Sequence, residues 1–196
     1  MLTEADARAK SDRELIALSA REPEVFLYLV RRYEDRLARF VRRISAVSAE
    51  DAEDILQEAF LKMYTHLHSY DPHWEFSSWA YRIVRHETIS AFRKRQARPC
   101  VTFADLGDEA VSRLASFADM AAETDQTLGR ERLERALNKL DVKYREAVVL
   151  KFLEDKTYDE IADILKLPPG TVATRINRAK KKLAGILRLT APYVRS

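Results

Sequence analysis

The side chains that could do chemistry in this chain are mainly cationic, and many lie near its C-terminus. Residues 167–183, LPPGTVATRINRAKKKL, contain five basic side chains and no acid. Surface helices usually mix both signs of charge, so this run indicates a surface that faces a negatively charged partner. An apolar stripe recurs at helical spacing through the same run: Val172, Ile176, Ala179 and Leu183. The expected chemistry is the binding of phosphate groups, as in a nucleic acid.

A short helix and a proline-rich turn precede the basic helix. Thr157 is a good N-terminal cap, and Lys166 and Leu167 form the expected turn. Pro168 disfavours helical backbone at the residue before it, whereas Pro169 is tolerated in a first helical turn. The residues of the short helix expected to face inward are Tyr158, Ile161, Ala162 and Leu165. This pattern is typical of a helix-turn-helix, whose second helix enters the DNA major groove.

The outward side of the basic helix supplies the expected DNA contacts. Base edges and phosphates would meet Ala173, Thr174, Asn177, Arg178 and Lys181. Phosphates would also meet the flanking Arg175, Lys180 and Lys182. The alternative is a solvated cationic helix packed in a bundle. The complete helix-turn-helix pattern favours DNA binding over that alternative.

Composition limits the other classes of function. The chain has 196 residues with a net charge of +3, four glycines and one cysteine, Cys100. The small number of glycines favours a helical protein. A single cysteine cannot form an internal disulfide, so we expect a cytoplasmic protein. The sequence has no membrane-length apolar run, and its N-terminus is unlike a signal peptide. It lacks familiar catalytic motifs, and its four histidines are poorly spaced for a metal site, so we expect no enzyme, metal or cofactor.

The elements that must position these groups are helices. Ser11 to Glu14 reads as a capping box that opens a first helix, and Pro23 ends it. Amphipathic patterns then predict helices over about 25–44, 51–67 and 77–96, followed after residue 128 by helices through 133–140 and 142–153. Residues 104–127 are acidic and weakly periodic, which indicates a linker. We expect an all-α protein with two small bundles, 1–96 and 128–196, joined by a flexible acidic linker over 97–127.

A second cationic region lies at the end of the first bundle. The loop SYDPHWEF, residues 69–76, brings Tyr70, His73, Trp74 and Phe76 next to a helix that carries Arg82, Arg85, Arg93, Lys94 and Arg95. Aromatic rings beside cations suit single-stranded DNA, because bases stack on the rings and phosphates follow the positive charge. Phe76 and Trp79 are expected in the core, whereas Trp74 lies off the apolar stripe.

Helix 51–67 has an acidic outer face with one exposed leucine. Outside its apolar stripe lie Asp51, Asp54, Gln57, Glu58 and Leu61. Such a face suits a protein partner with basic residues. It is also compatible with a solvated face whose acids interact favourably with the start of the helix.

Both halves of the chain resemble one bacterial family. DAEDILQEAFLKMYTHLHSYDPHWEFSSWAYRIVRHETISAFRKR is similar to domain two of sigma-70-family sigma factors. LNKLDVKYREAVVLKFLEDKTYDEIADILKLPPGTVATRINRAKKKL is similar to domain four. In its short length and its lack of a domain three, the chain resembles the extracytoplasmic-function (ECF) group.

The resemblance assigns roles to residues. It implies recognition of the promoter minus-ten element by Tyr70, Asp71, His73, Trp74, Arg85, His86, Ser90 and Arg93. It implies recognition of the minus-thirty-five element by Lys151, Thr171, Ala173, Thr174, Arg175, Asn177, Arg178 and Lys181. It implies that the acidic face of helix 51–67 binds core RNA polymerase. The family often has asparagine at the position of His86 and a basic or polar side chain at that of Ala173.

The resemblance also implies partners and a function. Those partners are core RNA polymerase, through its β′ coiled coil and β flap, promoter DNA, and an anti-sigma factor. The function is transcription initiation, in a family often used in stress responses. The alternatives are a DNA-binding regulator that uses only the C-terminal helix-turn-helix, and an all-helical enzyme, for which no converging acid–base or metal groups are evident.

Overall fold

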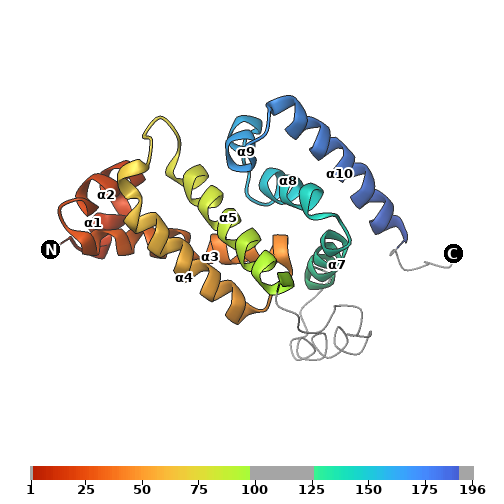
Figure 1. Cartoon of the computed structure of the whole chain (residues 1–196), viewed down its shortest axis with the longest axis horizontal. Coiled ribbons are helices and arrows are strands. Elements are labelled where there is room, and N and C mark those ends of the chain that lie inside the picture. The colour runs from red at the N-terminus through yellow and green to blue at the C-terminus, as the bar shows by residue number, and fades with distance from the viewer. Residues whose placement is uncertain (1, 98–125, 190–196) are drawn as a thin grey trace.

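The computed structural model describes residues 2–97 and 126–189, and this part of the chain is helical, without strands (Figure 1). The N-terminal set comprises α1 (Glu4–Ala9), α2 (Asp12–Ser19), η1 (Pro23–Val25), α3 (Phe26–Ser45), α4 (Ala49–Thr65), η2 (Leu67–Ser69) and α5 (Phe76–Ala97). The C-terminal set comprises α7 (Gln126–Asn138), α8 (Val142–Phe152), α9 (Tyr158–Leu165) and α10 (Pro169–Leu189). The all-α prediction is confirmed. Most of the predicted linker, with Cys100, lies outside the described residues.

Local capping interactions fix where several helices begin. Ser11 and Glu14 form the predicted capping box of α2, and Thr157 and Glu160 form the same motif at α9. In each case the hydroxyl accepts from the backbone N–H of the glutamate, and that glutamate accepts from the backbone of the cap. The short helix α1, capped by Thr3, was not predicted, because it is only six residues long.

The core of the N-terminal set lies between α3, α4 and α5. Most residues of the predicted stripes of α3 and α4 are buried, including Leu37, Phe40 and Met63. The ring of Tyr81 on α5 meets Phe40 edge-on at 4.9 Å between centroids, and its side chain is fully buried. Trp79 is also buried, as predicted. The aromatic pairs therefore fix α5, and with it the loop that precedes α5.

The C-terminal set contains the predicted helix-turn-helix. Lys166 ends α9 in a left-handed conformation with φ of 53°, and α10 begins at Pro169. Val172, Ile176 and Ala179 are buried, which orients the rest of α10 outward. The prediction that Tyr158 faces inward was wrong: its side chain is 41% exposed, because it lies at the first position of α9, beside Lys151.

The two helical sets pack against each other. Helix α5 contacts α9, and α3 contacts α7 and α8. The buried hydrophobic side chains form one contiguous cluster that includes residues of both sets. The sequence patterns describe each bundle separately and contain no sign of this packing. Within the described residues, every helix falls short of the length and hydropathy needed to cross a bilayer.

Candidate nucleic-acid interface

The exposed face of α10 holds most of the residues predicted to contact the minus-thirty-five element. Thr171, Thr174, Asn177, Arg178 and Lys181 are exposed. The Thr174 hydroxyl donates a hydrogen bond to the Gly170 carbonyl at 2.9 Å. Ala173 and Arg175 are partly buried. Because the apolar stripe of α10 is buried against α8 and α9, the polar face points away from the core as predicted.

A surface hollow lies between the start of α8 and the start of α10. It has a volume of about 520 Å³ and is lined by Lys143, Tyr144, Pro168, Gly170, Thr171, Thr174, Arg175 and Arg178. The ammonium groups of Lys143 and Lys182 lie 5.2 and 5.1 Å from the centre of the Tyr144 ring. Sequence reasoning missed Lys143 and Tyr144, although a cation beside an aromatic residue at a helix start was a usable signal. They extend the cationic surface of α10 onto α8.

Lys151, the predicted contact on α8, is partly buried in this arrangement. Its ammonium donates to the Lys156 carbonyl at 3.2 Å and lies 5.3 Å from the centre of the Tyr158 ring. Lys180 lies over Phe152 in a similar way, at 5.8 Å. These contacts hold two cations beside exposed aromatic rings at the far end of α8.

The loop before α5 has one buried and several exposed residues. Tyr70, predicted to contact DNA, is buried, and its hydroxyl donates to the Trp74 carbonyl at 2.6 Å. Asp71 accepts from the His73 backbone at 3.0 Å, and the ring Nδ1 of His73 lies 2.7 Å from the same oxygen. These bonds to His73 lower the pKa of Asp71. The Trp74 side chain is 41% exposed, so Tyr70 supports a loop that presents Trp74 to solvent.

The predicted contacts on α5 differ in accessibility. His86 and Arg93 are exposed, and Ser90 is partly buried. The His86 Nδ1 lies 2.9 Å from a carboxylate oxygen of Glu87, whose other oxygen accepts from Lys62 at 2.6 Å. Burial raises the pKa of Glu87, but its bonds with Lys62 and His86 outweigh burial and lower it overall.

Arg85 on α5 forms an ion pair with a residue of the C-terminal set. Its Nε and Nη2 each donate to a different oxygen of Glu146 on α8 at 3.0 Å. One helical turn earlier, Nη1 of Arg82 lies 3.0 and 3.1 Å from the two oxygens of Asp163 on α9. The structure thus brings Arg85 against a carboxylate, which the sequence did not predict.

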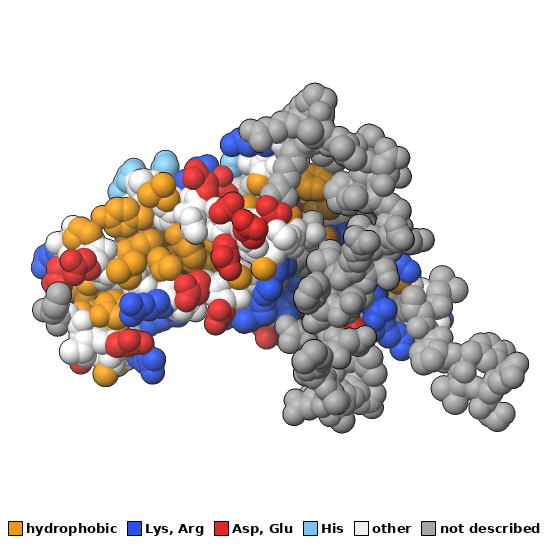
Figure 2. Space-filling model, turned by 90° about the horizontal axis from the view of Figure 1, so that it is seen from below, with side chains coloured by type: hydrophobic (Ala, Val, Ile, Leu, Met, Phe, Trp, Pro, Cys, Tyr) orange, Lys and Arg blue, Asp and Glu red, His pale blue; other side chains and the backbone are white. Residues whose placement is uncertain are grey.

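The acidic face of α4 is accessible and lies beside exposed apolar side chains. Asp54, Gln57, Glu58 and Leu61 are exposed, and Asp51 is partly buried. Sequence reasoning missed two exposed apolar side chains, Leu27 on α3 and Tyr64 on α4. The centre of the Tyr64 ring lies 5.4 Å from the centre of the Phe26 ring. Figure 2 shows a face on which hydrophobic side chains gather next to Asp and Glu side chains. Such a combination is suited to a protein partner.

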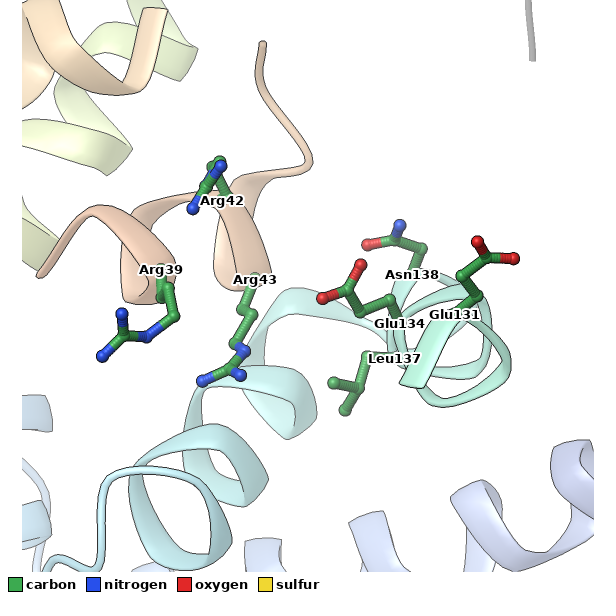
Figure 3. A pocket seen from close by; sticks show the side chains of 7 residues that line it. All are labelled: Arg39, Arg42, Arg43, Glu131, Glu134, Leu137 and Asn138. Atoms are coloured by element: carbon green, nitrogen blue, oxygen red, sulfur yellow. The ribbon is translucent and has the colours of Figure 1, made fainter. Parts of the chain in front are cut away.

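A polar cavity lies where α3 faces α7 (Figure 3). It has a volume of about 390 Å³ and is lined by Arg39, Arg42, Arg43, Glu131, Glu134, Leu137 and Asn138. The arginines of this cavity come from α3 and the glutamates from α7. The cavity therefore lies at the charged edge of the interface between the two helical sets. Residues 2–97 and 126–189 contain no cluster of three side chains with metal-ligating character.

Comparisons with known proteins agree with this architecture. Residues 29–98 match the family model Sigma-70 region 2, and residues 130–183 match Sigma-70, region 4. The ECF RNA polymerase sigma factor SigW of Bacillus subtilis is 32% identical over 171 residues, covering 85% of this chain and 91% of SigW. The ECF RNA polymerase sigma factor SigM of Mycobacterium tuberculosis is 32% identical over 179 residues, covering 91% of this chain and 85% of SigM.

A solved structure has a similar fold over most of the chain. CnrH, determined in complex with the cytosolic domain of CnrY, superposes with a TM-score of 0.68 at 26% identity. The match covers 93% of this chain and 100% of CnrH. The helix-turn-helix, the second cationic region and both family matches lead to one assignment: the chain belongs to the ECF RNA polymerase sigma factors of the sigma-70 family.

Proposed function

We propose that this protein binds core RNA polymerase, recognises promoter minus-ten and minus-thirty-five elements, and promotes transcription initiation. One combination of features carries the proposal. The chain belongs to a family of sigma factors and has cationic surfaces on α10 and on α5. It also has a separate acidic and apolar face on α4. In this role the protein positions DNA, and the polymerase performs the chemistry.

The minus-thirty-five element is assigned to the exposed face of α10. Thr174, Asn177 and Arg178 lie in the N-terminal half of α10, the part of a recognition helix from which side chains reach base edges in the major groove. Lys143 and Lys181 would contact phosphates and so position the helix without reading sequence. Lys151 would join them after release from its backbone contact with Lys156.

The minus-ten element is assigned to the loop before α5 and to α5 itself. Trp74 offers an exposed ring on which an unpaired base can stack, while Arg85 and Arg93 would follow the phosphates. Asp71 and His73 stabilise the loop through their mutual hydrogen bonds. In this assignment Tyr70 acts by supporting Trp74, since Tyr70 is buried.

Polymerase binding is assigned to α4 and the neighbouring apolar side chains. The acids Asp54 and Glu58 would pair with basic residues of the β′ coiled coil, and Leu61 and Tyr64 would supply buried apolar area. Domain four would bind the β flap. An anti-sigma factor would hold the free protein in the cytoplasm; CnrH, a solved relative, is likewise in complex with a domain of another protein.

A reconstituted transcription assay tests the proposal. Core polymerase from the source organism, with and without this protein, transcribes sheared chromosomal DNA, and the RNA 5′ ends are sequenced. We expect a set of start sites that depends on the protein and shares two upstream sequence elements. A regulator that uses only the helix-turn-helix would give no such sites without another sigma factor, and that result would exclude our proposal.

Charge reversal on α4 tests the polymerase face separately. We expect Asp54→Lys/Glu58→Lys to lose core polymerase in a pull-down while retaining its helical circular dichroism. The matched control, Glu34→Lys/Asp35→Lys, reverses two exposed acids of α3 and should bind normally. Equal binding by both variants would remove α4 from the polymerase interface.

A further inference from the structure

An aromatic cluster of four side chains encloses the two ends of the loop that presents Trp74. Tyr70 at the start of the loop and Phe76 directly after it meet edge-on, with 5.8 Å between ring centres. Trp79 lies 5.6 and 5.7 Å from these two rings. The fourth ring, that of Tyr33 on α3, meets Phe76 edge-on at 5.4 Å. All four side chains are buried, so the shape of the loop depends on how these rings pack.

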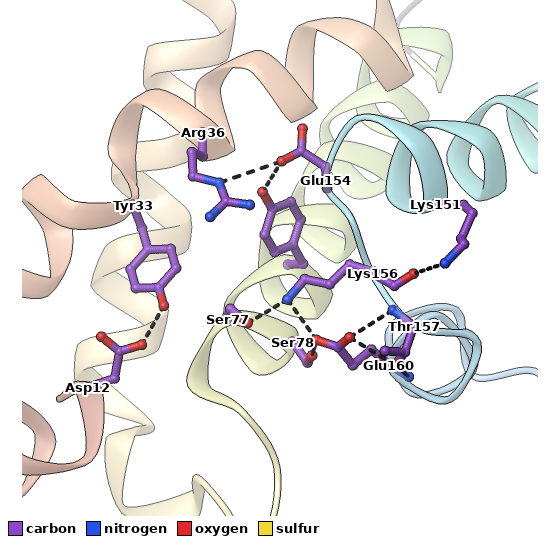
Figure 4. A network of polar contacts seen from close by, with 11 residues as sticks. Asp12, Tyr33, Arg36, Ser77, Ser78, Lys151, Glu154, Lys156, Thr157 and Glu160 are labelled. Atoms are coloured by element: carbon purple, nitrogen blue, oxygen red, sulfur yellow. Dashed lines mark hydrogen bonds and ion pairs between the residues drawn. The ribbon is translucent and has the colours of Figure 1, made fainter.

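The Tyr33 ring is oriented by a residue of α2. The Tyr33 hydroxyl donates a hydrogen bond to one carboxylate oxygen of Asp12 (Figure 4). The other oxygen of Asp12 accepts from Arg32 at 2.6 Å, and Arg32 also donates to the backbone carbonyls of Ala7 and Lys10 at 2.9 and 3.0 Å. Burial and the bond to Asp12 raise the pKa of Tyr33 well above its ordinary value, so its hydroxyl keeps the proton that it donates. Asp12 therefore joins α2 to the aromatic cluster.

A second residue of α2 acts on the loop itself. Burial raises the pKa of Tyr70, and the nearby Arg13 guanidinium partly offsets that rise. The Tyr70 hydroxyl in turn donates to the Trp74 carbonyl at 2.6 Å. This bond fixes the backbone that carries the Trp74 side chain. The start of α2 thus lies beside the groups that hold Trp74 in place.

We propose that Asp12 is a positioning residue for Trp74 and acts through Tyr33 and the aromatic cluster. Helix α2 lies before residues 29–98, which match the region 2 model, so it supports the loop from outside the matched segment. The contacts that carry the effect are made by residues of the N-terminal set. This inference rests on the proposed function, since it takes Trp74 to stack on an unpaired base.

The variant that tests this role most directly is Tyr33→Phe. It removes the hydroxyl that binds Asp12, keeps the ring that packs in the cluster, and leaves Asp12 paired with Arg32. Asp12→Ala is a harsher change, because it also leaves Arg32 without its acid. Where Asp12→Ala remains folded it should act on Trp74 as Tyr33→Phe does, and where it unfolds Tyr33→Phe alone decides.

The matched control is Tyr28→Phe, five residues earlier on α3. The Tyr28 hydroxyl donates to the Leu2 carbonyl at 2.7 Å, so this variant also removes a tyrosine hydrogen bond between α3 and the N-terminal segment. The Tyr28 ring lies 6.0 Å from the Arg31 guanidinium instead of in the aromatic cluster. A purely structural effect of untying the N-terminal segment should appear equally in both variants.

The first readout needs no DNA. The full chain is labelled with 5-fluorotryptophan, and its two fluorine resonances are assigned with Trp74→Phe. We expect Tyr33→Phe to shift or broaden the Trp74 resonance under conditions where circular dichroism shows a folded protein. Tyr28→Phe should leave that resonance at its wild-type position.

The second readout is strand separation by the holoenzyme formed from core polymerase and this protein. Permanganate reactivity of unpaired thymines is measured on a promoter mapped in the transcription assay. We expect Tyr33→Phe to reduce the open complex about threefold to fivefold, the equilibrium change that corresponds to one net hydrogen bond. Its binding to core polymerase should equal that of the wild type, because α4 is unchanged.

A double variant shows whether Tyr33 acts through Trp74. Tyr33→Phe/Trp74→Ala should lose no more open complex than Trp74→Ala, because both changes remove the same stacking contact. A general loss of stability would instead add to the effect of Trp74→Ala.

Three results would overturn the positioning role. They are an unchanged Trp74 resonance in folded Tyr33→Phe, equal open complexes in Tyr33→Phe and Tyr28→Phe, and additive losses in the double variant. Failure of the proposed function would look different, because start sites would then be independent of the protein. The fluorine spectra would still report whether Tyr33 determines the environment of Trp74.

Discussion

The hydroxyl of Tyr81 on α5 donates a hydrogen bond to the carboxylate of Glu154, which lies 73 residues later between α8 and α9. Both side chains are buried. Burial and the bond to Glu154 raise the pKa of Tyr81 well above its ordinary value. Arg43 and Arg36 lie 3.3 and 3.8 Å from the same carboxylate. One acid of the C-terminal set thus satisfies three groups of the N-terminal set.

Replacing Glu154 should destabilise the protein strongly. Glu154→Ala leaves a buried hydroxyl and two arginines without their acceptor, so we expect the free energy of unfolding to fall by about 3 kcal/mol. Tyr81→Phe removes one hydrogen bond and should cost about 1 kcal/mol. Urea unfolding followed by circular dichroism gives both values. With the exposed Glu53→Ala as control, a loss below about 0.5 kcal/mol for Glu154→Ala would contradict the assigned role.

The free energy of unfolding should decrease as the pH is lowered, in part because Glu160 becomes protonated. Burial raises the pKa of this carboxyl, but bonds from Lys156 and Thr157 outweigh burial and lower it to about 2, from an ordinary value of 4.5. Because the folded pKa is the lower one, the stabilisation is complete above pH 4.5 and is lost as pH falls toward 2.

The matched variant for this effect is Glu160→Gln, which cannot titrate. We expect the wild type to be more stable than Glu160→Gln near neutral pH, by about 2 kcal/mol after allowance for partial exposure. The difference should shrink as pH falls below 4.5. Urea midpoints measured from pH 6 to pH 2 test this, and a difference that stays constant with pH would show that another group is responsible.

Arg178 should determine part of the upstream specificity. If it makes a bidentate contact with a base, Arg178→Ala weakens holoenzyme binding by about 1–3 kcal/mol and relaxes preference at one base pair. The measurement is competition binding with promoters mapped in the transcription assay, each carrying one substituted base pair. Arg188→Ala, an exposed arginine in the last turn of α10, should leave the preference profile intact. An unchanged profile for Arg178→Ala would assign that residue to phosphate contact only.

Trp74 should act in strand separation. Stacking of a base on an aromatic side chain contributes about 1–3 kcal/mol, so Trp74→Ala should reduce the open complex about fivefold or more. Permanganate reactivity of unpaired thymines measures the open fraction. Phe92→Ala removes a similarly exposed ring from α5, 43% against 41% exposed, and should have little effect. Equal losses in the two variants would show that exposure of any ring, and not base stacking at Trp74, matters.

The sequence by itself determined the longer helices and the position of the turn. The periodicity of apolar residues, the capping boxes at Ser11 and Thr157, and the prolines at 168 and 169 act over a few residues. Local signals of this kind survive in any surroundings, so the predicted elements appear with small shifts at their ends. The exposed face of α10 follows in the same way, because a buried stripe leaves only one outward side.

Only the tertiary structure decided which cations are accessible. Arg85 and Arg178 look alike in the sequence, yet Arg85 is paired with Glu146 and Arg178 is exposed. Tyr70 and Trp74 were both predicted to contact DNA, yet Tyr70 is buried and Trp74 is exposed. The physical reason is that pairing between α5 and α8 depends on how two distant bundles pack, which helical periodicity does not encode.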